Sequence, residues 1–323
     1  METILMMMEI MTTYKDKTTV CKAKLVVRKI TWLSTILLTT FAVVTLTGCV
    51  NDELHNTPHP DKGALRITTD WTGLSKDAVP PESYLLRIGD LTHTVSGVEN
   101  TFNQLLPEGS YTLFVHNTPA GVTLNGAKAE VNTLPDGTLE LRPDYLFSAA
   151  TDFSAIKDDT LNVGVKMVQS LRILQLRLKL SAADLERIAS TAATLTGIAH
   201  RIDLATGQAE VAGTGKTVAP VFLTSDIHSA RAYTPTLVAL MRLADVASEK
   251  RQMLTLLFTL TDGSVVPIEE DLTELLKDFG KKKKPLLLDG EVKLPEKPTE
   301  MGVAGTITDW KAVTTVNGSA EMD

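Results

Sequence analysis

Apolar and polar residues alternate along most of the chain after Gly63. Five segments repeat apolar residues every second position: Leu65 and Ile67; Tyr111, Leu113 and Val115; Leu161, Val163, Val165 and Met167; Leu174, Leu176, Leu178 and Leu180; and Leu254, Leu256, Phe258 and Leu260. A period of two is typical of a β-strand with one buried face. The pattern therefore predicts a mainly β protein.

Turn-forming residues separate these segments. They occur at Pro107-Glu108-Gly109, Asn125-Gly126, Pro135-Asp136-Gly137, Asp262-Gly263 and Asp289-Gly290. Glycine and asparagine supply the positive φ angles that tight turns need. Many short strands between such turns favour β-sandwiches. We place a domain boundary near Gln169-Ser170, giving an N-terminal sandwich over 63–169 and a C-terminal sandwich over 170–323.

Two short stretches have helical spacing instead. Ser181 can cap a helix whose N3 residue is Asp184, with Leu185, Ile188, Ala189 and Ala192 on one face. Residues 271–279 carry Leu272, Leu275, Leu276 and Phe279 at the same spacing. Acids at Glu269, Glu270 and Asp271 precede this second helix, and Lys281 to Lys284 follow it, an order that suits the helix dipole.

The N-terminus has the pattern of a secretion signal. Lys22, Lys24, Arg28 and Lys29 precede an uncharged apolar run from Ile30 to Thr47, which ends in Leu46-Thr47-Gly48-Cys49. The last four residues match the lipobox of bacterial lipoproteins. We therefore expect residues 1–48 to be a cleaved signal peptide and Cys49 to be lipidated, with several acyl chains, such as palmitate, holding the protein at the membrane. The alternative is an uncleaved membrane-spanning anchor, which usually needs about 20 apolar residues. Met6, Met7, Met8 and Met11 are alternative start sites.

Charge and cysteine content narrow the class of protein. The first 48 residues contain three acidic and six basic side chains, so 36 acidic and 26 basic ones remain, a net charge near −10. Such a charge argues against a nucleic-acid partner. Cys21 is lost with the signal and Cys49 is lipidated, so we expect no disulfide. Residues 49–62, with acids directly after the cysteine and prolines at Pro58 and Pro60, read as a flexible acylated tether.

Several motifs resemble chemical sites without meeting their requirements. Gly213-Thr214-Gly215-Lys216-Thr217 resembles the end of a phosphate-binding loop, but Glu210 replaces the expected glycine and a strand-like run follows, so we favour a hairpin loop. Other candidates lack convergent partners: His55 and His59 in the tether, the scattered His93, His116, His200 and His228, the acids Glu269 to Asp271, and the lysines 281–284. We therefore expect no catalytic residue, no metal site and no cofactor.

The mature chain resembles a known family. It is similar to the FimB-type fimbrial anchor and assembly lipoproteins of the Bacteroidetes, within the fimbrillin-like proteins of type V pili. The resemblance covers residues 49–323. Its landmarks follow Cys49 in order: Leu65 to Trp71, Leu106 to Asn117, Arg142 to Phe147, the Leu254–Ile268 hairpin, Asp271-Leu272-Thr273, and Ile307-Thr308-Asp309-Trp310.

The resemblance implies two Greek-key, transthyretin-like sandwiches in tandem and a role in anchoring or assembling a fimbrium at the outer membrane, with fimbrillin-like subunits as partners. It also implies that subunits join by strand exchange, and that stalk subunits mature by an arginine-specific cut that removes the first strand. An anchor should keep that strand, and both Arg66 and Arg87 lie early enough to be cut. We expect no enzymatic activity and no small-molecule substrate. A fimbrial stalk or tip adhesin and a glycan-binding surface lipoprotein remain alternatives.

Overall fold

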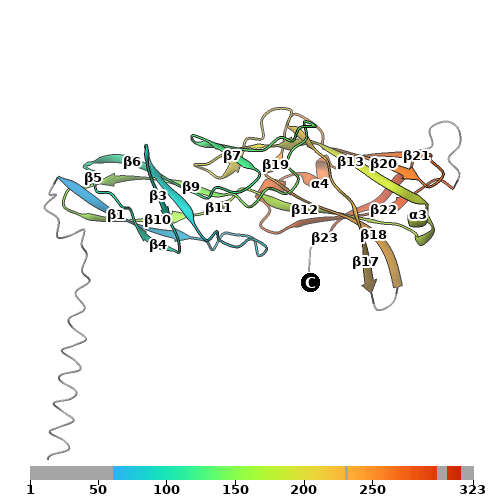
Figure 1. The fold of residues 1–323 in the computed structure, drawn as a ribbon, viewed down its shortest axis with the longest axis horizontal. Coiled ribbons are helices and arrows are strands. Elements are labelled where there is room, and N and C mark those ends of the chain that lie inside the picture. Colours follow the sequence, from blue (N-terminus) through green and yellow to red (C-terminus); the bar gives the residue numbers. More distant parts are fainter. Residues whose placement is uncertain (1–60, 230–231, 297–303, 314–323) are drawn as a thin grey trace, which may run out of the picture. The chain divides into compact units, whose positions relative to one another are not determined.

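The computed structural model describes residues 61–229, 232–296 and 304–313. Five β-sheets account for most of these residues, and the helices are short (Figure 1). The expected fold class, mainly β with a few short helices, is thus confirmed. Cys49 and the rest of the expected tether up to residue 60 lie outside the described residues, and Lys62, at the end of that tether, already belongs to the first strand.

Two sheets hold the first hydrophobic cluster. One contains β10 (Thr160–Lys166), β1 (Lys62–Asp70) and β4 (Glu99–Thr101) in that order, with β5 (Leu106–Pro107) also paired to β1. The other contains β11 (Val168–Gln169), β9 (Phe147–Ala155), β6 (Gly109–His116), β2 (Tyr84–Ile88) and β3 (Leu91–Val95). The cluster between them includes Leu65, Ile67, Leu113, Val115 and Val163.

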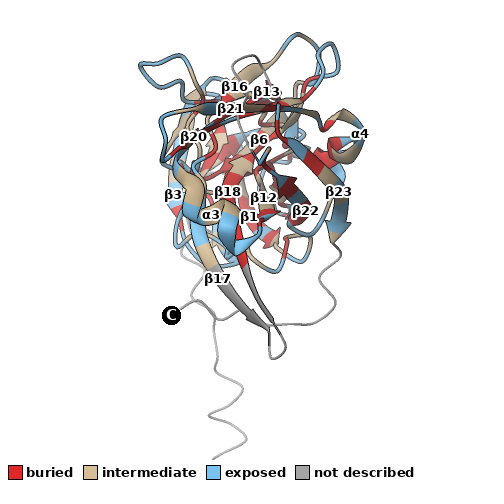
Figure 2. Ribbon diagram, turned by 90° about the vertical axis from the view of Figure 1, so that its right-hand side faces the viewer, coloured by how far each residue is buried: buried red, intermediate tan, exposed pale blue. Residues whose placement is uncertain are grey.

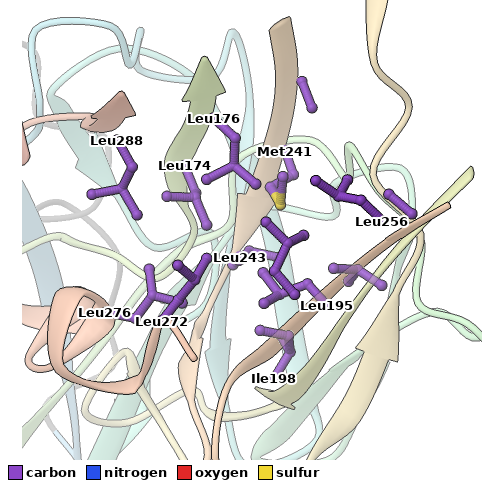
Figure 3. Close-up of a cluster of buried hydrophobic side chains, with 14 of the residues drawn as sticks. Leu174, Leu176, Leu195, Ile198, Met241, Leu243, Leu256, Leu272, Leu276 and Leu288 are labelled. Atoms are coloured by element: carbon purple, nitrogen blue, oxygen red, sulfur yellow. The ribbon is translucent and has the colours of Figure 1, made fainter. Parts of the chain in front are cut away.

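Two further sheets enclose the second cluster. One has the order β17 (Leu223–Ser229), β18 (Ala232–Leu243), β12 (Arg172–Lys179), β22 (Leu286–Lys293) and β23 (Thr306–Val313). The other has the order β16 (Lys216–Val218), β13 (Ile188–Ala199), β20 (Met253–Leu260) and β21 (Val265–Asp271), with β19 (Asp245–Val246) also paired to β13. Figure 2 shows buried residues along β12 and β18. Leu174, Leu195 and Met241 converge between the sheets (Figure 3).

The fifth sheet joins segments that are distant in the sequence. It has the order β15 (Gln208–Ala209), β14 (Arg201–Asp203), β8 (Lys128–Val131) and β7 (Val122–Asn125). Ala129 and Val131 pack into the second cluster, although both precede the boundary placed at Gln169-Ser170. The two clusters fit a tandem arrangement, and the exact domain limits stay a prediction.

The alternation identified the buried strand faces correctly. Leu174, Leu176 and Leu178 are all fully buried, as are Leu254, Leu256 and Phe258. The hairpin turn at Asn125-Gly126 is confirmed between β7 and β8, and the turn at Asp262-Gly263 between β20 and β21.

The turn expected at Asp289-Gly290 is wrong. Both residues lie inside β22, which pairs in parallel with β12. A side chain at Gly290 would place its Cβ 2.6 Å from Ile307 and 3.2 Å from Trp310. Glycine is therefore present for close packing inside the sheet and not for a turn.

Both helices are shorter than expected. Ser181 does cap α3 (Ala182–Arg187), with its hydroxyl accepting a hydrogen bond from the Asp184 amide. The chain then turns into β13 at Ile188, because residues from Ile188 onward pair with β20. The second helix, α4 (Thr273–Leu276), is followed by a 3₁₀ turn, η1 (Phe279–Lys281). Residues Glu269 to Asp271 end β21 and do not belong to a helix.

Candidate anchoring and assembly site

Strand β1 is the first described element after the tether, and it lies inside its sheet. It pairs in parallel with β10 at seven positions, from Ala64 opposite Thr160 to Asp70 opposite Lys166. Its other edge pairs antiparallel with β4 and β5. The first strand is thus held on both sides.

Alternate side chains of β1 enter the first hydrophobic cluster. Leu65 is 1% exposed and Ile67 is fully buried, while Arg66 and Thr68 face solvent. Burying a Leu or Ile side chain contributes about 1.5–3 kcal/mol. Removing β1 would therefore expose the core as well as break the backbone pairing.

A hydrogen-bond network fixes the far end of β1. Tyr84 Oη lies 3.1 Å from Thr69 Oγ1, donates to the Gly97 carbonyl at 2.8 Å, and accepts from Asn100 Nδ2 at 2.8 Å. Tyr84 is 2% exposed. Because its phenol connects β1, β2 and β4, this network joins both sheets around the first cluster.

Trp71 follows β1 and completes the same network. Its indole Nε1 donates to Thr69 Oγ1 at 2.9 Å, and its ring contacts Tyr84 and Phe147 edge-on at 5.5 and 5.6 Å between centroids. Beside it, hydrogen bonds from the side chain and backbone of Thr72 lower the pKa of the Asp70 carboxyl. Asp70 and Trp71 thus close the end of β1 by packing and local hydrogen bonds.

The two arginines considered as cleavage sites both lie in strands that are paired on both sides. Arg66 is opposite Asn162 on β10 and Thr101 on β4. Arg87 is opposite Thr92 on β3 and Phe114 on β6. No arginine occurs in the loop from Trp71 to Ser83.

This loop is also held in place. The amide and hydroxyl of Ser75 both donate to Gln169 Oε1, at 2.9 and 2.8 Å. The Tyr145 hydroxyl donates a short hydrogen bond to Asp77, and the Arg242 guanidinium lies 4.2 Å from the centre of the Tyr145 ring. Burial, followed by the Asp77 carboxylate, raises the pKa of the Tyr145 phenol, which therefore stays protonated as a donor.

The glycine-rich loop at 213–217 has no phosphate-binding geometry. Strand β16 begins at Lys216, so the loop is followed by a strand and not by the helix that a phosphate-binding loop needs. The Lys216 ammonium donates to Thr133 Oγ1 at 2.6 Å. The loop borders a pocket of about 320 Å³ that is also lined by His200 and Arg201.

The remaining candidate residues are dispersed. His93 lies in β3, His116 in β6 and His228 in β17, whereas His55 and His59 lie outside the described residues. Within the described ranges, no group of three potential metal-ligating residues occurs, and no helix is long and apolar enough to cross a bilayer. Glu270 Oε1 accepts a hydrogen bond from the Ile307 amide at 3.2 Å, which gives that acid a structural role.

Solved structures with a similar fold come from Porphyromonas gingivalis and Bacteroides ovatus. The fimbrial anchor protein Mfa2 from Porphyromonas gingivalis is 9% identical, covers 77% of this chain and 96% of its own, and aligns with a TM-score of 0.51. Two candidate adhesins from Bacteroides ovatus align with TM-scores of 0.54 (11% identity, 78% and 92% coverage) and 0.51 (17% identity, 77% and 95% coverage). At these identities the likeness shows the fold. No curated protein sequence matches the chain.

The family profile described as "Fimbrillin-A associated anchor proteins Mfa1 and Mfa2" matches residues 55–316, well over half of the chain. This match confirms the resemblance to fimbrial anchors found in the sequence. It indicates a fimbrium-associated role at the cell surface. The chain belongs to the family of fimbrillin-A associated anchor proteins Mfa1 and Mfa2.

Proposed function

We propose that this protein is a surface-exposed lipoprotein of the outer membrane that anchors or assembles a fimbrium by binding fimbrillin-like subunits. Its lipid is attached at Cys49, after removal of residues 1–48. In this proposal the folded body works by docking with other proteins and not by catalysis.

The position of β1 is the observation that carries the anchoring role. Cys49 is connected to the folded body only through the tether that enters β1 at Lys62. A cut after Arg66 or Arg87 would separate the lipid from the body. Proteases nick exposed loops in preference to paired strands, and both arginines lie in strands with neighbours on either side. These positions support an anchor that keeps its first strand over a stalk subunit that loses it.

Free sheet edges support docking to other subunits. Among the described strands, β17 pairs only with β18, and β3 pairs only with β2. An edge strand presents unpaired N–H and C=O groups that can bind an added strand. Leu223, at the start of β17, is 60% exposed and lies beside this edge.

The two tryptophans of the mature chain argue against sugar capture. Trp71 packs on Tyr84 and Phe147, and Trp310 packs against the second hydrophobic cluster. Neither ring is an open platform for a sugar. Subunit docking is therefore favoured over glycan binding.

Metabolic labelling and mass spectrometry test the anchor. Labelled palmitate should enter the wild-type protein and not the Cys49→Ser variant, and the mature N-terminus should be the acylated Cys49. An N-terminus between Arg66 and Tyr111 would instead identify a stalk or tip subunit.

Limited proteolysis tests the protection of β1. An arginine-specific protease should leave the folded chain uncut at Arg66. The internal control is Arg251, a native arginine outside the strands whose side chain is 78% exposed. Cleavage at Arg66 at the rate seen at Arg251 would contradict the proposed retention of β1.

A further inference from the structure

The path of the chain determines how a pull on the tether reaches the folded body. The tether enters β1 at its N-terminal end, Lys62. The parallel partner β10 ends at Lys166, and the chain continues from there through β11 into β12, a strand of the second cluster. Along this path of the chain, a pull between the tether and the C-terminal sheets acts on opposite ends of two adjacent parallel strands.

This arrangement loads the two strands in shear. When parallel strands are pulled from the N-terminus of one and the C-terminus of the other, the force runs along the strands. All hydrogen bonds of the ladder are then stretched together. When both strands are pulled from the same end, the bonds break one after another. Resistance to force depends on the barrier to unfolding, which is higher when several bonds must break at once.

The ends of the ladder carry additional backbone hydrogen bonds. The Ala64 amide donates to the Asp159 carbonyl at 2.8 Å and the Asp158 amide donates to the Lys62 carbonyl at 2.9 Å. At the other end, the Met167 amide donates to the Asp70 carbonyl at 2.9 Å. The ladder is thus extended beyond the seven paired positions in both directions.

Side-chain packing opposes sliding of β1 along β10. Leu65 and Ile67 are buried in the first cluster together with Val163 and Val165 of β10. Gly63 lies so close to the backbone that an added Cβ would be 2.2 Å from the Ile156 carbonyl oxygen. Movement of β1 along its axis would draw these groups out of fitted positions in a close-packed interior.

We propose that β1 and β10 form a mechanical clamp that holds the anchored end of the chain when the fimbrium is pulled away from the cell. The clamp rests on the proposed lipid attachment at Cys49, because that attachment is what directs the pull into Lys62. Retention of β1 thus gives the anchor mechanical strength as well as a covalent connection to its lipid.

Single-molecule force spectroscopy on the mature chain carrying Cys49→Ser tests the clamp. Positions 50–323 contain no cysteine, so pairs of introduced cysteines give unique attachment points. The variant Lys62→Cys with Lys166→Cys pulls β1 and β10 in shear. The matched control, Lys62→Cys with Lys157→Cys, pulls the same strands apart from one end, since Lys157 is exposed just before β10. Circular dichroism checks that both variants are folded.

The rupture forces of the shear pair should shift to clearly higher values than those of the control pair. Equal or lower forces in the shear geometry would overturn the clamp and leave lipid anchoring untouched. Failure of palmitate to label Cys49 would overturn the anchor and leave the force measurement unchanged. The two proposals can therefore fail separately.

Discussion

Arg177 on β12 forms a two-point ion pair with Asp289 on β22. The guanidinium Nε lies 2.6 Å from one carboxylate oxygen and Nη2 lies 2.8 Å from the other. Lys179 adds a second cation at 3.3 Å from the same carboxylate. Asp289 is 8% exposed, so the Arg177 and Lys179 side chains take the place of most of the water around its carboxylate. The pair crosses two parallel strands that are distant in sequence.

Asp289→Ala should destabilise the protein by about 2 kcal/mol, because hydrogen bonds to charged groups contribute about 1.5–3 kcal/mol. The loss leaves Arg177 without its partner. Chemical denaturation with urea measures the effect. Glu291→Ala is the control, since Glu291 is exposed in the same strand, and its effect should stay within about 0.5 kcal/mol. Equal effects of the two substitutions would contradict the importance of the pair.

Gly290→Ala should also be destabilising, by about 1–3 kcal/mol, because the new Cβ would overlap Ile307 and press on Trp310. Gly164, inside β10, has open space around its Cβ position. Gly164→Ala should therefore be neutral or slightly stabilising. Thermal unfolding of both variants gives the comparison, and a Gly290→Ala variant as stable as Gly164→Ala would disprove the packing argument.

Tyr84→Phe removes a buried hydroxyl that donates to the Gly97 carbonyl and accepts from Asn100 Nδ2. We therefore expect the free energy of unfolding to fall by about 1–3 kcal/mol. Tyr111→Phe removes an exposed hydrogen bond to the Pro107 carbonyl and should cost less than about 0.5 kcal/mol. Urea titrations of the two variants test this difference. The Tyr84 network would have no role in stability if both variants unfolded at the wild-type midpoint.

His116 should make stability depend on pH. Burial, and secondly the nearby charge of Arg87, lower its pKa below the ordinary value. Above a pH of about 6.5 the imidazole is neutral in both the folded and unfolded states, so stability is complete there. As the pH falls below that value, the unfolded chain binds a proton before the folded one does, and stability is lost down to the folded pKa. His116→Gln should flatten this part of the profile of melting temperature against pH; an unchanged slope would rule out the role of His116.

The sequence predicted those features that depend on neighbouring residues. Alternation placed Leu174, Leu176 and Leu178 on a buried face, because side chains of a strand point to opposite sides in turn. Ser181 and Asp184 were sufficient to place a helix start. The order of landmarks from Cys49 to Trp310 also indicated the fimbrial anchor family, which the profile match confirms.

Features that depend on pairing between distant segments were missed. Asp289-Gly290 has the composition of a turn, but pairing with β12 keeps it in a strand. The helix expected to continue past Arg187 ends there, because Ile188 and the residues after it pair with β20 in a sheet. The helix or turn preference of a single residue is worth about 1 kcal/mol or less, so strand pairing and side-chain burial override it.

By itself, the sequence determined the strand-rich class, the buried faces and the membership of the fimbrial anchor family, since each depends on residue types and their local spacing. Only the tertiary structure decided that β1 lies between β10 and β4, that the backbone at Arg66 is therefore paired on both sides, and that the tether enters a parallel pair of strands. The physical reason is that parallel partners are joined by long crossover connections, so no short-range pattern records which strands will meet.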